Sequence, residues 1–473
     1  MLKLSTMADS AEDFYKEKVP LLGSLIDWMI DSDIDYGPLA AGISLSLFLL
    51  GLFVFGVSGG QVLALFIALT PVWLPIILFL LFFHKWMDMV GAKFYLNQGR
   101  TTLRLKIPQE IFKSPEAMEF VISQIHNTAN PDNLMQTYFD GKRPLPFSFE
   151  IVSLGGEVRF YVNLPTKKSK NAFEANIYAQ YPGIEVVEEP VDYAAELPID
   201  YKSKNWNVFA VHMRKKKDQE FPIKTYIDFG LNDMPKEEEK VDPITPMLEV
   251  MASIKPHENL FVQIICVSFR PNSFKNGQLT IGEGPSWTKG VEEKINEIMK
   301  RDPKTKGPLN SGEESDFEGM PRLTPGERDK IESMERNAEK YAYNVGIRWI
   351  YVNKEGGFNG DLMNPMIRVF SQYDLINRNA LGVAWRTDFD YKDIIPGGKR
   401  KALLALKKQE IKEYKLRKYF PKGGLDDYKI FTAEELATMF HIPGKVALTP
   451  TLERIPSTRA EAPPNLPIGQ LPQ

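Results

Sequence analysis

The sequence predicts an α+β fold that consists of an N-terminal transmembrane hairpin of two helices followed by cytoplasmic ferredoxin-like (βαββαβ) domains. Two long runs without any charge lie within the first 84 residues. Beyond them, strand-like alternation of polar and apolar residues is interleaved with helix-like spacing. The composition of the 473 residues, 43% hydrophobic and 25% charged, is typical of folded protein. We therefore expect folded domains attached to a membrane anchor.

The predicted hairpin occupies residues 37–84, behind an acidic leader of residues 1–36. Its two helices are expected at about 37–57 and 62–83, and each run is long enough to cross a hydrocarbon core of roughly 30 Å. Only residues 58–61 separate the runs, which suits a tight turn. The leader lacks the basic start of a cleaved signal peptide, so we expect it to be retained.

Basic residues that follow the second run predict the orientation of the hairpin. They are Lys85, Lys93, Arg100, Arg104 and Lys106. Because positive charge next to a membrane helix favours the cytoplasmic side, this end of the hairpin is expected inside the cell. Two crossings then place both termini in the cytoplasm, and the lipid bilayer is a predicted partner.

The first predicted domain, residues 98–195, has the order βαββαβ. Ser114 suits a helix N-cap, and the pair Gly155-Gly156 suits the turn of a hairpin. The predicted elements are strand Thr101–Pro108, helix Ser114–Ala129, a hairpin over Phe147–Pro165, helix Lys170–Pro182 and strand Gly183–Pro190.

A second α+β domain is predicted over residues 200–395. Within it, a loop at about 301–325 is rich in Pro, Gly, Ser and acidic residues and is predicted to be disordered. The short basic run 214–217 is predicted to be a hairpin loop. The other predicted elements are strands at 207–213, 221–230, 260–269 and 346–353, and helices at 243–254, 326–344 and 360–375.

Residues 396–442 are predicted to form a basic helical segment, and residues 443–473 a proline-rich tail. Between positions 397 and 422 the chain carries ten Lys or Arg residues against only Glu410 and Glu413. Such a helix can bind nucleic acid or acidic lipid, although a solvated surface helix has the same composition. The candidate contact residues are Lys399, Arg400, Lys401, Lys407, Lys408, Lys412, Lys415, Arg417 and Lys418.

Motifs that carry catalytic chemistry are missing from the sequence. Each Gly-Lys pair lacks the Ser or Thr that binds magnesium in a phosphate-binding loop. The five histidines are scattered, and the single cysteine, Cys266, lies in an apolar run. Residues 56–60 match the G-x-S-x-G pattern of serine hydrolases but fall in the predicted hairpin turn. We therefore expect a protein without enzymatic activity, cofactor or metal.

Four segments give the sequence a resemblance to a known family. They are FSFEIVSLGGEVRFYVNLP (147–165), EANIYAQYPGIEVVEE (174–189), TAEELATMFHIPG (432–444) and TPTLERIPSTRAEAPPNLP (449–467). In these segments the chain resembles the N-terminal region of bacterial conjugative type IV secretion proteins, the membrane-anchored DNA-translocating or coupling ATPases. The resemblance covers most of the predicted cytoplasmic region and includes no catalytic residue.

The resemblance implies a place in the bacterial inner membrane and a role in moving DNA or protein. In that family a tail like residues 449–467 leads into a RecA-like motor with Walker motifs, and this sequence has no such motif. Either the motor is a separate chain that docks on this one, or the sequence is a piece of a longer protein. In both cases the implied function is that of a non-catalytic, membrane-anchored component that positions a motor ATPase.

The implied partners are the translocation ATPase or other secretion subunits, DNA, and further copies of the chain in a ring. An alternative function is that of a membrane-bound scaffold. Such a scaffold would bind partner proteins through its sheet edges or its tail, with no role for nucleic acid.

Overall fold

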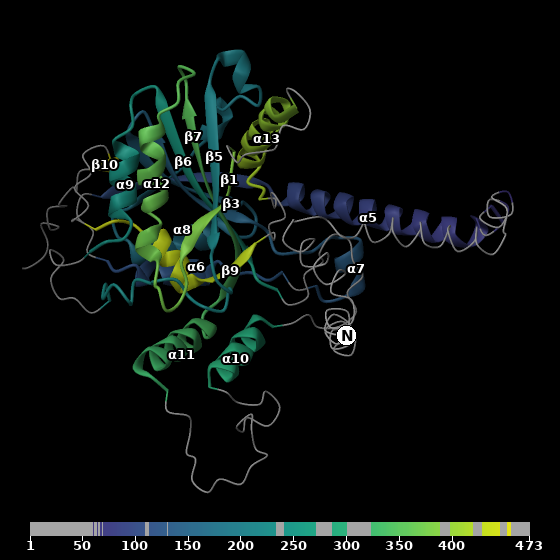
Figure 1. The fold of residues 1–473 in the computed structure, drawn as a ribbon, viewed down its shortest axis with the longest axis horizontal. Coiled ribbons are helices and arrows are strands. Elements are labelled where there is room, and N and C mark those ends of the chain that lie inside the picture. Colours follow the sequence, from purple (N-terminus) through teal and green to yellow (C-terminus); the bar gives the residue numbers. More distant parts are fainter. Residues whose placement is uncertain are drawn as a thin grey trace, which may run out of the picture. The chain divides into compact units, whose positions relative to one another are not determined.

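A mostly antiparallel sheet organises the part of the chain that the structure describes (Figure 1). The structure is a computed structural model, and it describes residues 60, 64, 67–68, 70–108, 113–129, 131–232, 241–270, 286–299, 323–387, 398–419, 428–444 and 452–455. The strands are β1 (Arg100–Pro108), β2 (Phe147–Leu154), β3 (Glu157–Pro165), β4 (Glu185–Glu188), β5 (Asn207–Lys215), β6 (Glu258–Ser268), β7 (Ala342–Asn353), β8 (Leu381–Arg386), β9 (Lys429–Thr432) and β10 (Arg454–Ile455).

These ten strands follow the order β10-β1-β3-β2-β6-β7-β5-β8, with β4 paired to β1 and β9 paired to β7. Nine of them form antiparallel ladders, and β10 adds a short parallel pair to the end of β1. The helices are α5 (Thr70–Gln98), α6 (Glu116–Gln124), α7 (Leu134–Tyr138), α8 (Lys170–Gln180), α9 (Thr245–Ala252), α10 (Trp287–Ile298), α11 (Pro325–Ala338), α12 (Met363–Arg368), α13 (Gly398–Lys415) and α14 (Ala433–Met439).

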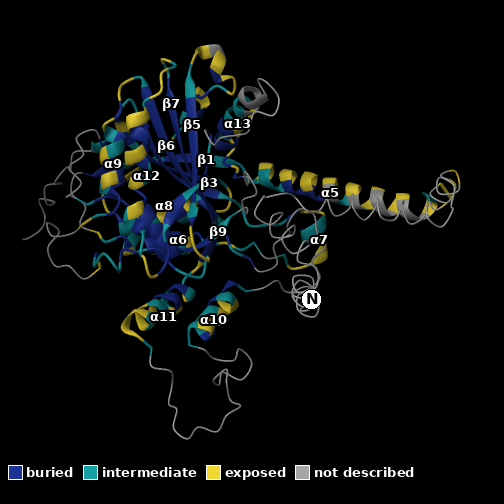
Figure 2. Cartoon of the chain, in the orientation of Figure 1, coloured by how far each residue is buried: buried dark blue, intermediate teal, exposed yellow. Residues whose placement is uncertain are grey.

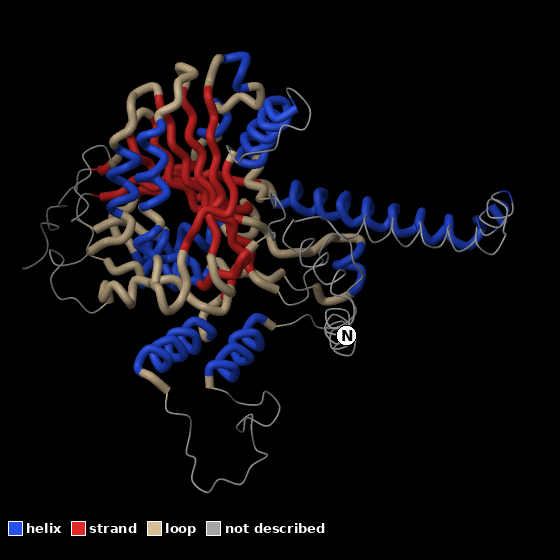
Figure 3. Tube along the Cα trace, in the orientation of Figure 1, coloured by secondary structure: helices blue, strands red, loops and turns tan. Residues whose placement is uncertain are grey.

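The order βαββαβ occurs twice within this single sheet. In the first half, β1, β2, β3 and β4 lie in the order β4-β1-β3-β2. In the second half, β5, β6, β7 and β8 lie in the equivalent order β8-β5-β7-β6. The second strands of the two halves, β2 and β6, pair antiparallel from Phe147↔Cys266 to Leu154↔Asn259. The two halves therefore share one continuous sheet, which Figure 3 shows as an unbroken set of strands.

The sheet has a large apolar face and a smaller one. The large face is covered by α6, α8, α9, α12 and α14, whose buried residues join one core cluster with side chains such as Phe149 and Trp349. On the opposite face, α13 and the 3-10 helices η1 (Tyr193–Glu196) and η2 (Tyr201–Lys204) cover a second cluster. Because successive side chains of a strand point to opposite faces, each central strand contributes to both clusters. Figure 2 shows the central strands buried between these layers.

The predicted transmembrane hairpin is corrected by the structure. Among the described residues, no helix is both long enough and apolar enough to cross a membrane. The first predicted crossing, residues 37–57, lies outside the described residues. The second, at 62–83, is described continuously from Thr70, where it belongs to α5. In α5 the apolar run without interruption extends only from Ile76 to Phe83, about two helical turns. The predictions of a hairpin and of a two-pass inner-membrane protein are therefore wrong.

The predicted fold class is also wrong in expecting separate ferredoxin-like domains. The sequence shows where strands begin and end, but the partner of β2 lies more than a hundred residues along the chain in β6. This pairing removes the free edge at which a first domain would end. Contacts divide the chain at Lys85 and leave Trp86–Gln473 as one unit.

Most of the individual elements predicted beyond the membrane segment are confirmed. These include strand β1, the β2–β3 hairpin, strand β6 and helices α8 and α9. The predicted strand at 221–230 is not present, because Asp228 accepts hydrogen bonds from the backbone and side chain of Thr225 and holds a turn. The leader, most of the 301–325 loop and the end of the tail lie outside the described residues.

Candidate functional site

A row of polar side chains crosses the smaller face of the sheet. Glu150 of β2 is the register partner of Gln263 in β6, Gln263 is the partner of Arg348 in β7, and Arg348 is the partner of His212 in β5. All four residues are completely buried. Direct register partners stand side by side on one face, so strand pairing assembles them into a continuous polar row.

Helix α13 lies over this polar row and supplies acidic partners to two of its members. Glu410 Oε2 is 2.9 Å from His212 Nε2, and Arg348 donates to Gln263 Oε1 at 2.6 and 2.9 Å. Arg348 Nη1 also lies 4.0 Å from Glu410 Oε2 and 3.9 Å from Glu413 Oε2. Buried polar groups need such partners, because leaving them unpaired away from water is costly. The row therefore fixes which face of α13 turns inward.

Arg417 anchors the C-terminal end of α13. Its guanidinium donates to both carboxylate oxygens of Glu150, at 3.1 and 3.2 Å, and to both carboxylate oxygens of Asp192. Its backbone has a φ of 51°, in the left-handed region, which turns the chain out of the helix. Burial alone would raise the pKa of Glu150, but the charge of Arg417 and the hydrogen bonds from Arg417, Ser148 and Tyr193 together outweigh it, so the pKa lies below its ordinary value. The pair is thus charged and desolvated.

The inward turn of α13 separates its charges by sign. The side chains of Glu410 and Glu413 are 0% and 5% exposed, and both face the sheet. Lys412 and Lys418 are exposed. Positions 408, 412 and 415 share the outer side of the helix by the 3.6-residue repeat. The acids that balance the basic residues in the sequence are therefore not on the outer surface of α13.

The structure places the nine predicted contact residues in different surroundings. Lys399, Arg400 and Lys401 lie in the first turn of α13, and their side chains are outside the described part. Lys407 donates to Asn207 Oδ1 at 3.3 Å, and the half-exposed Lys408 pairs with Asp200 at 3.0 Å. Lys415 donates to the carbonyl oxygens of Ala195 and Leu197 at 3.3 and 2.9 Å. Lys412 and Lys418 are exposed, whereas Arg417 is buried and holds Glu150 instead of facing a partner.

The basic run 214–217 also serves the fold. The run 214–217 is not a hairpin loop, because Arg214 and Lys215 belong to β5. Lys215 is buried and lies 2.7 Å from Glu435 of α14.

Among the residues that the structure describes, no group of three or more His, Cys, Asp or Glu side chains is placed to hold a metal ion. Burial raises the pKa of the Cys266 thiol well above its ordinary value, which disfavours the reactive thiolate.

Sequence analysis missed the polar row, although a signal for it is present. Glu150, Gln263, Arg348 and His212 each stand between two apolar neighbours in the interior of a strand. A lone polar residue in such a strand indicates a buried polar contact, but only the strand register shows that the four meet.

Comparison with known protein families gives a match. The profile of a family described as Domain of unknown function (DUF8128) matches residues 97–373. The matched range begins just before β1 and ends at η5 (Ser371–Tyr373), so it includes the polar row but not α13. No curated protein matches the chain.

Proposed function

The chain belongs to the DUF8128 family. We propose that it is a non-catalytic component of a DNA-translocation machine of the type IV secretion kind. In this role it contacts DNA through the lysines on the outer side of α13 and just after its end, namely Lys408, Lys412, Lys415 and Lys418. The motor ATPase that moves the DNA belongs to another domain or another chain. The sequence resemblance supports a role in DNA translocation, and the charge arrangement of α13 supports a contact with DNA.

The separation of charges on α13 is the observation that carries this proposal. The whole chain has a formal charge of −3, so attraction to DNA has to come from a local surface. Glu410 and Glu413 are held against the sheet by His212 and Arg348, which removes the two acids of this helix from the outer surface. The outer side of α13 is consequently more basic than its sequence indicates.

The spacing of the outer lysines suits a phosphate backbone. Positions 408 and 415 are separated by seven residues, which corresponds to about 10 Å along the helix axis. One DNA strand presents about three phosphates over that length. Because Arg417 fixes the end of α13 to Glu150 and Asp192, the lysines are held on a rigid support. Asp200, which pairs with Lys408, is an exposed acid that a phosphate can replace.

Fluorescence anisotropy with labelled single-stranded and duplex oligonucleotides tests the proposal. The wild-type chain is compared with Lys412→Glu/Lys418→Glu over a series of salt concentrations. The matched control is Lys113→Glu/Lys289→Glu, which changes the net charge equally at two exposed lysines, one just before α6 and one in α10. Loss of two phosphate contacts lowers the slope of log affinity against log salt by about 2 for duplex DNA.

The expected result is salt-sensitive binding that the α13 variant loses and the control retains. Equal losses in both variants would mean that binding follows net charge and not this helix. Absence of binding by the wild-type chain at low salt would overturn the proposal. A protein partner that stays bound at high salt, with no affinity for DNA, would favour the scaffold function instead.

A further inference from the structure

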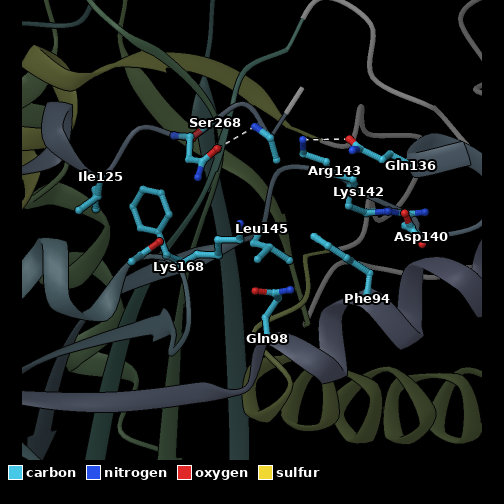
Figure 4. Close-up of a pocket in the computed structure, with 14 residues that line it drawn as sticks. Phe94, Gln98, Ile125, Gln136, Asp140, Lys142, Arg143, Leu145, Lys168 and Ser268 are labelled. Carbon is cyan, nitrogen blue, oxygen red and sulfur yellow. Dashed lines mark hydrogen bonds between the residues drawn. The ribbon is translucent and has the colours of Figure 1, made fainter. Parts of the chain in front are cut away.

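A cavity of about 300 Å³ lies among the C-terminal end of α5, helix α7 and the ends of β2 and β6 (Figure 4). This volume is at the lower end of the range for small-molecule sites. Its apolar wall is formed by Phe94, Ile125, Leu145 and Phe147. The cavity is separate from the contacts of α13, so an inference about it does not depend on the proposed DNA contact.

The polar side of the cavity is rich in positive charge. Lys142, Arg143 and Lys168 line it, and Asp140 is the one acid among the described lining residues. Behind the wall, the buried Arg270 donates to the carbonyl oxygen of Ala129, which is itself a lining residue. Lys142 also pairs with the exposed Asp132 at 3.3 Å and donates to Gln136 Oε1 at 3.0 Å. Three basic residues therefore line the cavity, and Arg270 lies behind its wall.

Neither guanidinium group forms an ion pair with a described carboxylate, although the charge of Asp88 acts on Arg143 from farther away and raises its pKa against the effect of burial. Arg143 donates to the carbonyl oxygens of Gly141 and Met87, at 3.2 and 3.3 Å, and packs against the backbone of Gly91. Burial lowers the pKa of Arg143. Burial also lowers the pKa of Arg270, and the nearby charge of Arg143 lowers it further. An anion between these groups would relieve the desolvation and the repulsion together.

Two neutral groups complete the cavity. The side-chain oxygen of Gln98 is buried without a hydrogen-bond partner among the described residues. Ser268 Oγ accepts from the backbone N–H of Asn127, which leaves its own proton available for donation. The cavity thus offers hydrogen-bonding groups of both kinds beside its positive charge.

We propose that this cavity binds a small organic phosphate, a phosphate monoester of nucleotide size. Lys142, Arg143 and Lys168 face the phosphate, and the apolar part of the ligand lies against Phe94 and Phe147. A phosphate dianion fits better than a carboxylate because it can form ion pairs with several cations at once. The planar guanidinium group can also donate two parallel hydrogen bonds to two phosphate oxygens. The free nucleotide and the phosphorylated end of a DNA strand share this chemistry, and experiment distinguishes them.

Isothermal titration calorimetry of the purified chain with adenosine 5′-monophosphate tests the site. Inorganic phosphate and adenosine are titrated separately, and a 5′-phosphorylated oligonucleotide is compared with its unphosphorylated form. Lys168→Glu is the first variant, because the side chain of Lys168 is exposed and its replacement should leave the fold intact. Arg143→Gln is the second, and Lys113→Glu is the control for net charge.

We expect the monophosphate to bind, phosphate to compete with it, and adenosine alone to fail. Each of the two cavity variants should weaken binding about tenfold, because each removes one charge-assisted contact, while the control stays within about twofold. Binding of the phosphorylated oligonucleotide in preference to the unphosphorylated form identifies a strand end as the source, and its absence identifies the free nucleotide. Equal binding of adenosine, equal loss in the control, or no heat up to millimolar monophosphate would overturn the proposal.

Discussion

Replacement of Arg417 by methionine should strongly destabilise the fold. The Arg417 side chain is 4% exposed and Glu150 is 0% exposed, so solvent does not screen the pair. Loss of one member of a buried ion pair typically costs about 3–5 kcal/mol, because the other charge remains buried without compensation. Glu150 would keep its hydrogen bonds from Ser148, Tyr193 and Gln263. We therefore expect the lower end of this range, about 3 kcal/mol.

Urea denaturation followed by circular dichroism measures this loss at pH 7. The second variant, Glu150→Gln/Arg417→Met, removes the stranded charge and should recover at least half of the lost free energy of unfolding. A single-variant loss below about 1 kcal/mol, or a double variant no more stable than the single one, would refute the reasoning, because the pair would then contribute no more than an exposed one.

The same variant should show a defined pH dependence. In the wild-type fold the pKa of Glu150 lies below its ordinary value of 4.5, so its contribution to stability is present above pH 4.5 and is lost as the pH falls through the lowered pKa. Without Arg417, burial raises the pKa of Glu150, and protonation relieves the stranded charge as the pH falls. The stability difference between wild type and Arg417→Met should therefore shrink from pH 7 to pH 4.

Three further variants test other parts of the fold. Gly346→Ala should lower the free energy of unfolding by about 1–3 kcal/mol, because the new Cβ would lie 2.4 Å from the buried ring of Tyr419. His441→Gln should lower the free energy of unfolding most at low pH. Burial lowers the pKa of His441, but Asp242 raises it more. The stabilising contribution of His441 is therefore present below its ordinary pKa of 6.5 and is lost as the pH rises through the raised pKa. Thr324→Ala should cost about 1 kcal/mol, because it removes the N-cap of α11. Thermal melting measures the effects of Gly346→Ala and Thr324→Ala, and urea unfolding across pH measures the effect of His441→Gln.

Each of these variants has a control or a contradicting result. Gly360→Ala places its Cβ 3.8 Å from Phe358, so it should be nearly neutral where Gly346→Ala is not. A constant effect of His441→Gln from pH 5 to pH 9 would show that the ion pair with Asp242 does not contribute. A Thr324→Ser variant keeps the capping hydroxyl and should behave like the wild type.

The sequence predicts much of the local structure because local signals determine it. The β2–β3 hairpin follows from alternating apolar residues around Gly155 and Gly156, both of which adopt positive φ. Helix α14 begins at Thr432, whose capping box with Glu435 is visible in the sequence. Such elements need no information from distant parts of the chain.

The joined sheet and the site depend on contacts that the sequence does not reveal. The pairing of β2 with β6 joins strands that are far apart in the sequence. The polar row forms only when these strands pair in this register. The composition of α13 predicts a basic helix, but not that Glu410 and Glu413 turn inward, because their partners His212 and Arg348 lie on other strands. The charge-free run at 62–83 predicted a membrane crossing, whereas no described helix is long and apolar enough to form one.

Site-specific photo-crosslinking tests the central claim, that the outer side of α13 contacts DNA, most directly. A photoreactive amino acid is placed at Leu416, which is 46% exposed and follows the outer lysines, and separately at Phe120, which is 45% exposed on α6 over the opposite face. If the outer side of α13 contacts DNA, position 416 gives a salt-sensitive crosslink to labelled DNA and position 120 gives none. Equal crosslinking from both positions, or crosslinking from position 120 alone, would contradict it.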